Sequence, residues 1–262
     1  MRIAAVQFRP QFGEVEANLD RMLALMAPEQ ADLFVLPELA FSGYIFESKD
    51  ELLALSQTPD APELDRVSEA ASGMGAVVVV GFAEREGKEV YNAAVLLGPG
   101  GERAVYRKIH LFDREKDLFA PGGRPPEVVE VRGVRYGLMV CFDWIFPEMA
   151  RTLALMGADV LCHPANLVLP YCQDAMVTRC IENRVFAVTA NRTGTEARAA
   201  LSLTFTGASE IVSPRGVVLT RGSPDRDEVL VAEVDPGAAR DKLVTPANDV
   251  FRDRRPDLYR VR

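Results

Sequence analysis

A continuous apolar run at residues 76–81, Ala-Val-Val-Val-Val-Gly, constrains the fold of this chain more than any other feature. A run without polar interruption is typical of a strand that is buried on both of its faces. Such a strand needs a layer of structure on each side. Other apolar runs predict further strands at residues 2–7, 32–36, 136–140, 159–162, 185–190, 201–212, 216–220 and 229–234.

Helical patterns alternate with these strands. Apolar residues recur at helical spacing in residues 16–26, 63–74, 146–156 and 176–184, and Pro147 suits a first helical turn. Residues 89–98 and 101–106 predict a hairpin that turns at Gly-Pro-Gly-Gly. Because a hairpin mixes antiparallel with parallel pairing, the pattern favours a layered α/β sandwich with mixed sheets over a TIM barrel, which the chain length also allows.

Length and composition indicate the class of protein. The 262 residues are 48% hydrophobic, so we expect a single globular domain over residues 1–262. Residues 236–262 are charged and irregular, which predicts a C-terminal tail that packs on a partner subunit. The formal net charge of −8 argues against binding to nucleic acid or anionic membranes. Without a membrane-spanning run or a signal peptide, we expect a cytoplasmic protein.

Sulfur and imidazole ligands are scarce. The four cysteines, Cys141, Cys162, Cys172 and Cys180, form no C-x-x-C pair and no regular spacing, which predicts reduced thiols. Neither of the two histidines, His110 and His163, has a cysteine at metal-ligand spacing. We therefore expect no metal site and no cofactor.

Three predicted strand ends carry chemically useful side chains: Glu38, Lys108 and Cys141. Open α/β sheets place their chemistry at strand ends. A carboxylate, an amine and a thiol supply a base, an oxyanion stabiliser and a nucleophile, which is the minimum set for acyl transfer. The helix predicted to begin near Pro147 would lower the pKa of the nearby thiol. Alternatively, Cys141 is a small buried residue, Glu38 a solvated turn carboxylate and Lys108 a surface charge.

Other functions fit the residues less well. Cys141 with His163 or His110 would make a Cys-His hydrolase, but His163 precedes a proline at a strand end, which is also typical of a structural histidine. The G-x-S-x-G turn of many serine hydrolases does not occur. From a different class, a catalytically silent binding or scaffold protein would leave the three side chains together by accident.

The chain resembles the nitrilase superfamily of carbon-nitrogen hydrolases. Motifs along nearly the whole chain carry the resemblance: Leu36-Pro37-Glu38, Tyr106-Arg107-Lys108-Ile109-His110-Leu111, Cys141-Phe142-Asp143 with Phe146-Pro147-Glu148, and His163-Pro164-Ala165-Asn166 with Glu182-Asn183-Arg184. The resemblance implies an α-β-β-α sandwich, usually paired into a homodimer or a higher homo-oligomer.

The resemblance also implies roles for individual residues. Glu38 would be the general base, Lys108 the oxyanion stabiliser and Cys141 the nucleophile, with Glu115 as an additional glutamate that positions substrate and base. The backbone N–H of Phe142 would join Lys108 in holding the oxyanion. The substrate would be a small amide; a small aliphatic mononitrile or dinitrile and an N-carbamoyl compound are the alternatives.

Five residues near these positions are candidates for the pocket wall. Tyr44, Trp144 and Ile145 flank the catalytic positions, although core packing accounts equally well for each of them. Asn166 and Leu167 follow the His163 strand end and are further candidates for substrate binding.

Overall fold

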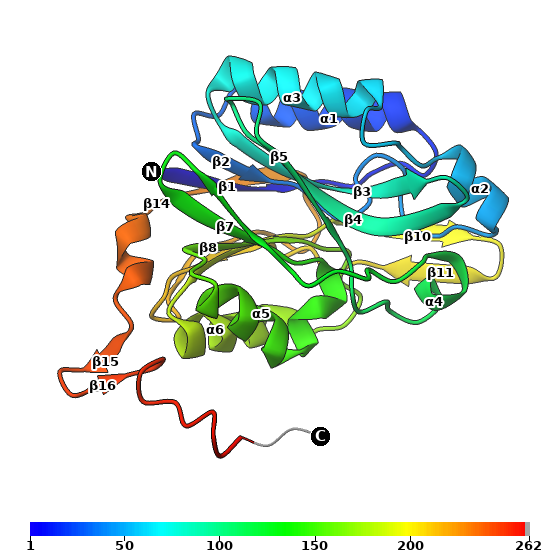
Figure 1. Cartoon of the computed structure of the whole chain (residues 1–262). Helices are drawn as coiled ribbons and strands as arrows, with labels where there is room; N and C mark the ends of the chain where they lie inside the picture. The colour runs from blue at the N-terminus through cyan, green and yellow to red at the C-terminus, as the bar shows by residue number, and fades with distance from the viewer. Residues whose placement is uncertain (260–262) are drawn as a thin grey trace.

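Two facing sheets form the centre of the computed structural model, which describes residues 1–259 (Figure 1). Each of these two mixed sheets has six strands. The first has the order β14 (Glu228–Glu233), β1 (Arg2–Gln7), β2 (Leu33–Val35), β3 (Val77–Glu86), β4 (Glu89–Leu97) and β5 (Arg103–Arg107). The second has the order β13 (Val218–Arg221), β12 (Glu210–Val212), β9 (Phe186–Ala190), β8 (Val160–Pro164), β7 (Val134–Leu138) and β6 (Val128–Val131).

Helices cover the outer faces of both sheets and confirm the predicted α-β-β-α sandwich. Figure 1 shows α1 (Val15–Met26) and α3 (Pro62–Met74) over the first sheet, and α5 (Pro147–Leu155) and α6 (Cys172–Asn183) over the second. The short helices α2 (Lys49–Ala54) and α4 (Glu115–Leu118) lie at one end with the ribbon of β10 (Thr195–Arg198) and β11 (Leu201–Thr204).

Strand alternation explains the layers. Ile3 and Ala5 of β1 pack in the core between the two sheets, whereas Ala4 and Val6 pack with residues of α1 and α3. Successive side chains of a strand point to opposite faces, so a strand covered on both sides is apolar throughout. The Val77–Val80 run of β3 is buried on both faces in the same way, as its sequence predicts.

Strand direction brings the candidate residues toward one region. In the first sheet β2 and β3 are parallel, and β5 runs in the same direction because β4 is antiparallel to both β3 and β5. Glu38 and Lys108 therefore follow strands that end at the same edge. In the second sheet β7 and β8 are parallel, and their carboxyl ends lead to Cys141 and Asn166.

Some predicted elements are wrong in detail. Residues 201–212 form two strands, β11 and β12, because the chain turns at Gly207 and Ala208, which both have positive φ angles. The sequence patterns did not predict the short elements α2, α4, β6 and β10. Four- to six-residue elements such as these are too short to show a clear hydrophobic period.

The C-terminal segment leaves the sandwich (Figure 1). It contains the 3-10 turn η2 (Pro236–Arg240) and the short strands β15 (Leu243–Thr245) and β16 (Asn248–Asp249). Arg240 anchors its start by donating hydrogen bonds to Asp159 and to the carbonyl of Gly133. The predicted tail also includes residues 260–262, which lie outside the described residues, and its packing on a partner remains a prediction.

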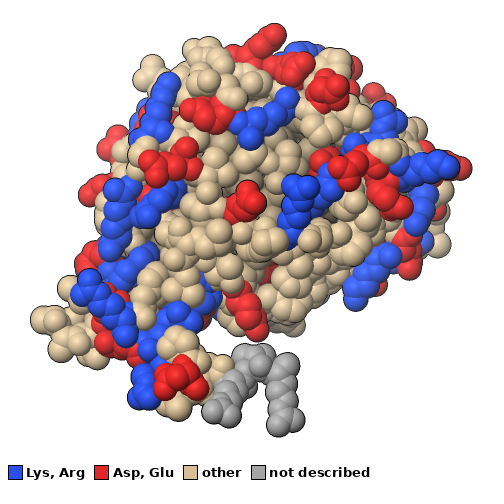
Figure 2. Space-filling model, in the orientation of Figure 1, with Lys and Arg blue, Asp and Glu red and all other residues tan. Residues whose placement is uncertain are grey.

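The surface shows no field of a single charge sign on the face drawn in Figure 2, where acidic and basic side chains are interspersed. Among residues 1–259, every helix is too short or too polar to cross a membrane.

Gly81 of β3 provides a test of the packing behind Glu38. A Cβ atom at residue 81 would overlap the backbone of Glu38 and lie 2.7 Å from the carbonyl oxygen of Pro37. We expect Gly81→Ala to lower the free energy of unfolding by about 1–3 kcal/mol in urea denaturation, because this backbone has no room to move. Gly73→Ala is the matched control: it lies in α3 with open space around it and should raise stability by about 0.5–1 kcal/mol. Equal effects of the two substitutions would contradict this account.

Candidate active site

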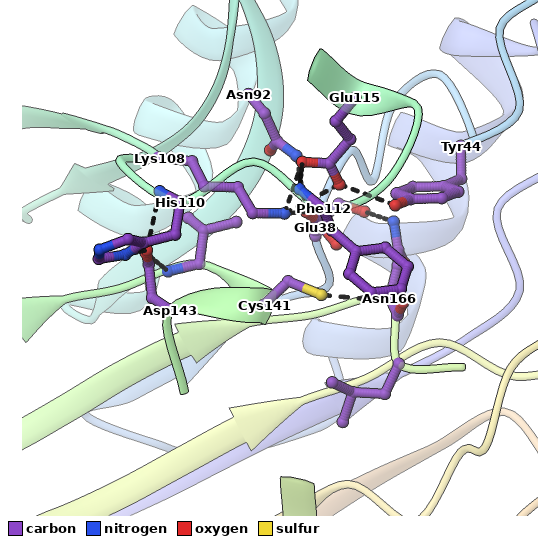
Figure 3. A network of polar contacts seen from close by, with 12 residues as sticks. Glu38, Tyr44, Asn92, Lys108, His110, Phe112, Glu115, Cys141, Asp143 and Asn166 are labelled. Atoms are coloured by element: carbon purple, nitrogen blue, oxygen red, sulfur yellow. Dashed lines mark hydrogen bonds and ion pairs between the residues drawn. The ribbon is translucent and has the colours of Figure 1, made fainter. Parts of the chain in front are cut away.

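Glu38 lies just past β2 with its side chain fully buried. Its Oε1 accepts hydrogen bonds from Nδ2 of Asn92 at 2.6 Å and from Nζ of Lys108 at 2.8 Å (Figure 3). Its backbone carbonyl accepts a third from Nδ2 of Asn166 at 2.9 Å. Burial raises the pKa of Glu38 and outweighs the opposing effect of Lys108. Three side chains thus hold Glu38 in place, and its carboxylate is more basic than an exposed one.

Lys108 lies past the end of β5 with a fully buried ammonium group between two carboxylates. Its Nζ is 2.8 Å from Glu38 and 2.8 Å from Glu115. Burial alone would lower the pKa of Lys108, but Glu115 and Glu38 outweigh burial and hold that pKa well above its usual value. Because a buried charge is stable only when it is paired, the two glutamates fix the ammonium in place.

Glu115 joins this cluster from the start of α4. Besides the ammonium group, its carboxylate accepts the hydroxyl of Tyr44 at 2.7 Å and the backbone N–H of Phe112 at 3.1 Å. Burial, together with Glu115, raises the pKa of Tyr44 well above its usual value, so the phenol stays protonated and donates. Figure 3 shows Tyr44, Glu115, Lys108 and Glu38 as one connected network.

Cys141 lies at the start of the 3-10 turn η1 (Cys141–Ile145), between β7 and α5. Its φ angle of +42° is in the left-handed region, which is strained for a residue with a side chain. The side chain points to the polar cluster in Figure 3, and Sγ lies 3.8 Å from the carbonyl oxygen of Asn166. Only 5% of the residue is exposed.

The expected effect of a helix terminus on this thiol is wrong. Helix α5 begins only at Pro147, beyond the η1 turn, so its N-terminus is not next to Cys141. Burial and the carboxylate of Glu38 instead raise the pKa of Cys141 well above its usual value, although Lys108 opposes them. The resting thiol is therefore protonated, and only a base could convert it into a thiolate.

Asp143 holds the η1 turn from inside. Its fully buried carboxylate accepts hydrogen bonds at 2.8 Å from the backbone N–H of Val140, the hydroxyl of Tyr106 and Nδ1 of His110. The His110 ring also stacks on Phe146, with ring centroids 3.8 Å apart. Asp143 and Tyr106 were not predicted to support the site, although both lie within the motifs that carry the resemblance to the nitrilase superfamily.

His163 supports the same turn from the other side. Its Nε2 donates to the carbonyl of Cys141 at 2.9 Å, and its Nδ1 lies 3.1 Å from the hydroxyl of Thr189. Burial lowers the pKa of His163 to about 4, so the ring is neutral. With His163 bonded to backbone and Thr189, and His110 bonded to Asp143, the Cys-His alternative finds no support in this geometry.

The predicted pocket residues divide into two groups. Hydrogen bonds connect Tyr44 and Asn166 to the cluster, and the N–H of Leu167 donates to Asn191 at 2.8 Å. In contrast, Trp144 packs in the core between the sheets and helices, and Ile145 is 40% exposed.

Two further features lie beside the polar cluster. The backbone N–H of Phe142 lies in the first turn of η1, where N–H groups have no partner within the helix. A small cavity of about 50 Å³ borders Tyr44 and Glu115. Its other walls are mostly apolar, with Phe112, Leu118 and Phe119 around α4, and Leu201 and Leu203 on β11.

The fold and the cluster together define a class: an α-β-β-α protein with a buried thiol next to a Glu-Lys-Glu network. The chain matches the carbon-nitrogen hydrolase family over residues 2–242 and belongs to that family, within the nitrilase superfamily. It is a hydrolase that acts on carbon-nitrogen bonds. This assignment argues against the silent scaffold.

Three similar proteins support the assignment. A nitrilase from Pyrococcus abyssi (strain GE5 / Orsay) is 43% identical over 263 residues, covering 99% of each chain. An (R)-stereoselective amidase from Pseudomonas sp is 36% identical over 241 residues, covering 90% of this chain and 85% of its own. An amidase from Nesterenkonia sp. AN1, solved as a double mutant in complex with acrylamide, has a TM-score of 0.81 at 27% identity and covers 98% of this chain and 95% of its own.

The neutral, buried state of His163 predicts a specific loss of stability in acid. Its pKa is about 4 in the folded protein against 6.5 in an unfolded chain, so between these values the unfolded chain binds more protons. This contribution is fully present above pH 6.5 and is lost as the pH falls toward 4, by about 3 kcal/mol. In urea denaturation at several pH values, His163→Gln should lose less unfolding free energy than the parent over that window. Equal losses would contradict the assignment.

Proposed function

We propose that this enzyme hydrolyses a small amide through a thioester on Cys141, releasing ammonia and a carboxylic acid. One observation carries the proposal: the ammonium of Lys108 is buried between Glu38 and Glu115 next to a buried thiol. That arrangement supplies a base, a nucleophile and a fixed positive charge in a site shielded from water.

Glu38 acts first, as the general base for Cys141. The thiol is protonated at rest, and burial of Glu38 makes it a stronger base than an exposed carboxylate. Within residues 1–259, Oε2 of Glu38 is buried without a hydrogen-bond partner, so this oxygen is available for the proton. Proton transfer leaves a thiolate and a neutral Glu38.

Attack by the thiolate on the amide carbon then produces a tetrahedral oxyanion. The Lys108 ammonium and the N–H of Phe142 stabilise this oxygen, and one such donor contributes about 100- to 1000-fold in rate. Glu115 does not transfer the proton in this scheme. Its bonds to Lys108 and Tyr44 keep the ammonium aimed at the oxyanion.

Collapse of the intermediate completes the first half of the reaction. Glu38 returns its proton to the amide nitrogen, the carbon-nitrogen bond breaks, and ammonia leaves a thioester on Cys141. Glu38 is again a carboxylate and takes a proton from water, whose oxygen attacks the thioester carbon. The acid departs and the thiol is restored.

Substrate size follows from the surroundings. The buried thiol favours a short acyl group, and the small, mostly apolar cavity that borders Tyr44 and Glu115 is the candidate site for it. The relative solved with acrylamide supports an amide. A nitrile is the second candidate, because the relative that is 43% identical is named a nitrilase and the same attack on a nitrile carbon gives a thioimidate. An N-carbamoyl compound presents a comparable carbonyl carbon.

Ammonia release tests this proposal. The panel contains short amides, ω-amido acids, ureido acids, mononitriles and dinitriles. Cys141→Ala should abolish release, and Glu38→Gln should lower it at least about 100-fold because the base is lost. Glu210→Gln is the matched control: it removes another buried carboxylate, which pairs with Arg221 outside the site, and should retain turnover.

Each outcome of the panel has a clear meaning. Release from amides alone supports the proposed substrate class, and release from nitriles alone selects the second candidate. Wild-type turnover by folded Glu38→Gln would contradict the role of Glu38. Quenched wild-type enzyme should carry the acyl group on Cys141 in mass spectrometry.

Residues 1–262 are further proposed to act as one domain in a homodimer or higher homo-oligomer, with residues 236–262 packed on a partner. The supporting observation is that apolar side chains remain exposed on this outlying segment, with 53% of Val244 and 64% of Leu258 accessible. Size-exclusion chromatography with light scattering should give at least twice the mass of one chain. A stable monomer at micromolar concentration would contradict this prediction.

A further inference from the structure

A buried ion pair lies behind the segment that carries Tyr44. Arg192 is fully buried, and its guanidinium donates to Glu196 of β10 at 2.6 Å. It also donates to the carbonyl of Pro10 at 3.2 Å and lies 4.1 Å from the ring centroid of Phe205. Glu196 itself is 6% exposed. The proposed proton transfers use neither residue.

The carboxylate of Glu196 binds the backbone of the Tyr44 segment. It accepts the N–H of Tyr44 at 3.0 Å and the N–H of Ile45 at 2.5 Å, across about 150 residues of sequence. Gly43 permits this approach: its φ angle is +83°, and a Cβ there would lie 2.9 Å from Cα of Phe12 and 3.1 Å from Glu196. Glu196 therefore fixes the backbone position from which the Tyr44 side chain extends.

Tyr44 transmits that position to the active site. Its hydroxyl donates to Glu115 at 2.7 Å, and Glu115 is paired with Lys108 at 2.8 Å. The Tyr44 ring packs edge-on against Phe205, the same ring that lies under Arg192, with centroids 5.8 Å apart. One continuous set of contacts thus joins Arg192, Glu196, Tyr44, Glu115 and Lys108.

We infer that Glu196, held by Arg192, is a positioning residue of this enzyme, which acts through Tyr44 to keep Glu115 and the Lys108 ammonium aligned for the oxyanion. The inference rests on the proposed function of Lys108. Displacing a catalytic group by about 1 Å can cost about 100-fold in rate, even when the substitution lies away from the reacting atoms. Because alignment matters most in the transition state, losing it lowers kcat more than it changes KM.

A double-mutant cycle on kcat and KM tests the inference. Glu196→Gln keeps the side-chain size and one acceptor oxygen but loses the charge that faces Arg192, and Tyr44→Phe removes only the hydroxyl. Each should lower kcat by up to about 100-fold with KM changed by less than about threefold. If Glu196 acts through the Tyr44 hydroxyl, the double variant should be no slower than the slower single variant.

Two matched variants separate positioning from general stability. Glu51→Gln weakens the partly buried pair between α2 and Arg198, on the same ribbon. It should leave kcat within about twofold because the hydrogen bonds of Glu51 go to Glu47, Ser48 and Arg198 rather than to Tyr44. Glu196→Asp keeps the charge and provides a folded variant if Glu196→Gln does not fold. Its shorter side chain cannot keep all three partners, so its kcat should lie between those of the parent and Tyr44→Phe.

Other outcomes would overturn the inference. Independent, multiplicative losses in kcat would show that Glu196 does not act through Tyr44. A lower melting temperature with unchanged kcat would make the pair purely structural. If the wild type releases no ammonia from any substrate, the proposed function fails, and the cycle is then measured on the alkylation rate of Cys141 by iodoacetamide, which depends on the nearby Lys108 charge. Non-additive effects there would still support the positioning role, and additive effects would reject it.

Discussion

The buried ammonium of Lys108 is the interaction on which the rest of the site depends. A cation without access to water requires anionic partners. Here two glutamates that are far apart in the sequence provide them: Glu38 after β2 and Glu115 at the start of α4. Asn92 of β4 shares the Glu38 oxygen and also accepts the backbone N–H of Lys108. A shift in strand register would leave one of these charges unpaired, so the network and the first sheet stabilise each other.

The thiol of Cys141, the proposed nucleophile, is held by polar groups that do not take its proton in the proposed reaction. Cys141 keeps a left-handed φ angle because His163 binds its carbonyl and Asp143 binds the N–H of Val140 just before it. Strained backbone persists only where the surrounding structure fixes it on several sides. Both histidines of the chain serve this support, which is consistent with the proposal that a carboxylate, Glu38, takes the proton of the thiol.

Features of the fold and the site could be predicted from the sequence where they depend on residues that are close together in the chain. Apolar runs and helical periods are local, so β1 has its predicted bounds and α3 differs from its prediction by one residue. Strand β3 begins as expected but extends to Glu86, beyond the apolar run that ends at Gly81. Glu38, Lys108 and Cys141 stand at strand ends that sequence patterns identify, so the structure places them together as expected, although their roles remain proposals. The contact between Glu196 and Tyr44 joins segments about 150 residues apart, so no local sequence pattern predicts it. The raised pKa of Cys141 likewise depends on burial and on Glu38, which only the folded chain brings near.

In the proposed reaction, the ribbon of β10 and β11 would affect both substrate selection and the alignment of Lys108. Glu38, Lys108 and Cys141 would treat an amide, a nitrile or a carbamoyl carbon alike, so selection falls to the walls around them. The ribbon of β10 and β11 supplies Leu203 to the apolar cavity and, on its neighbouring strand, Glu196 to the Tyr44 backbone. Glu196 pairs directly with Leu203 across that ribbon. A change of ribbon shape that admits a larger acyl group would therefore also move Tyr44, which links specificity to the alignment of Lys108.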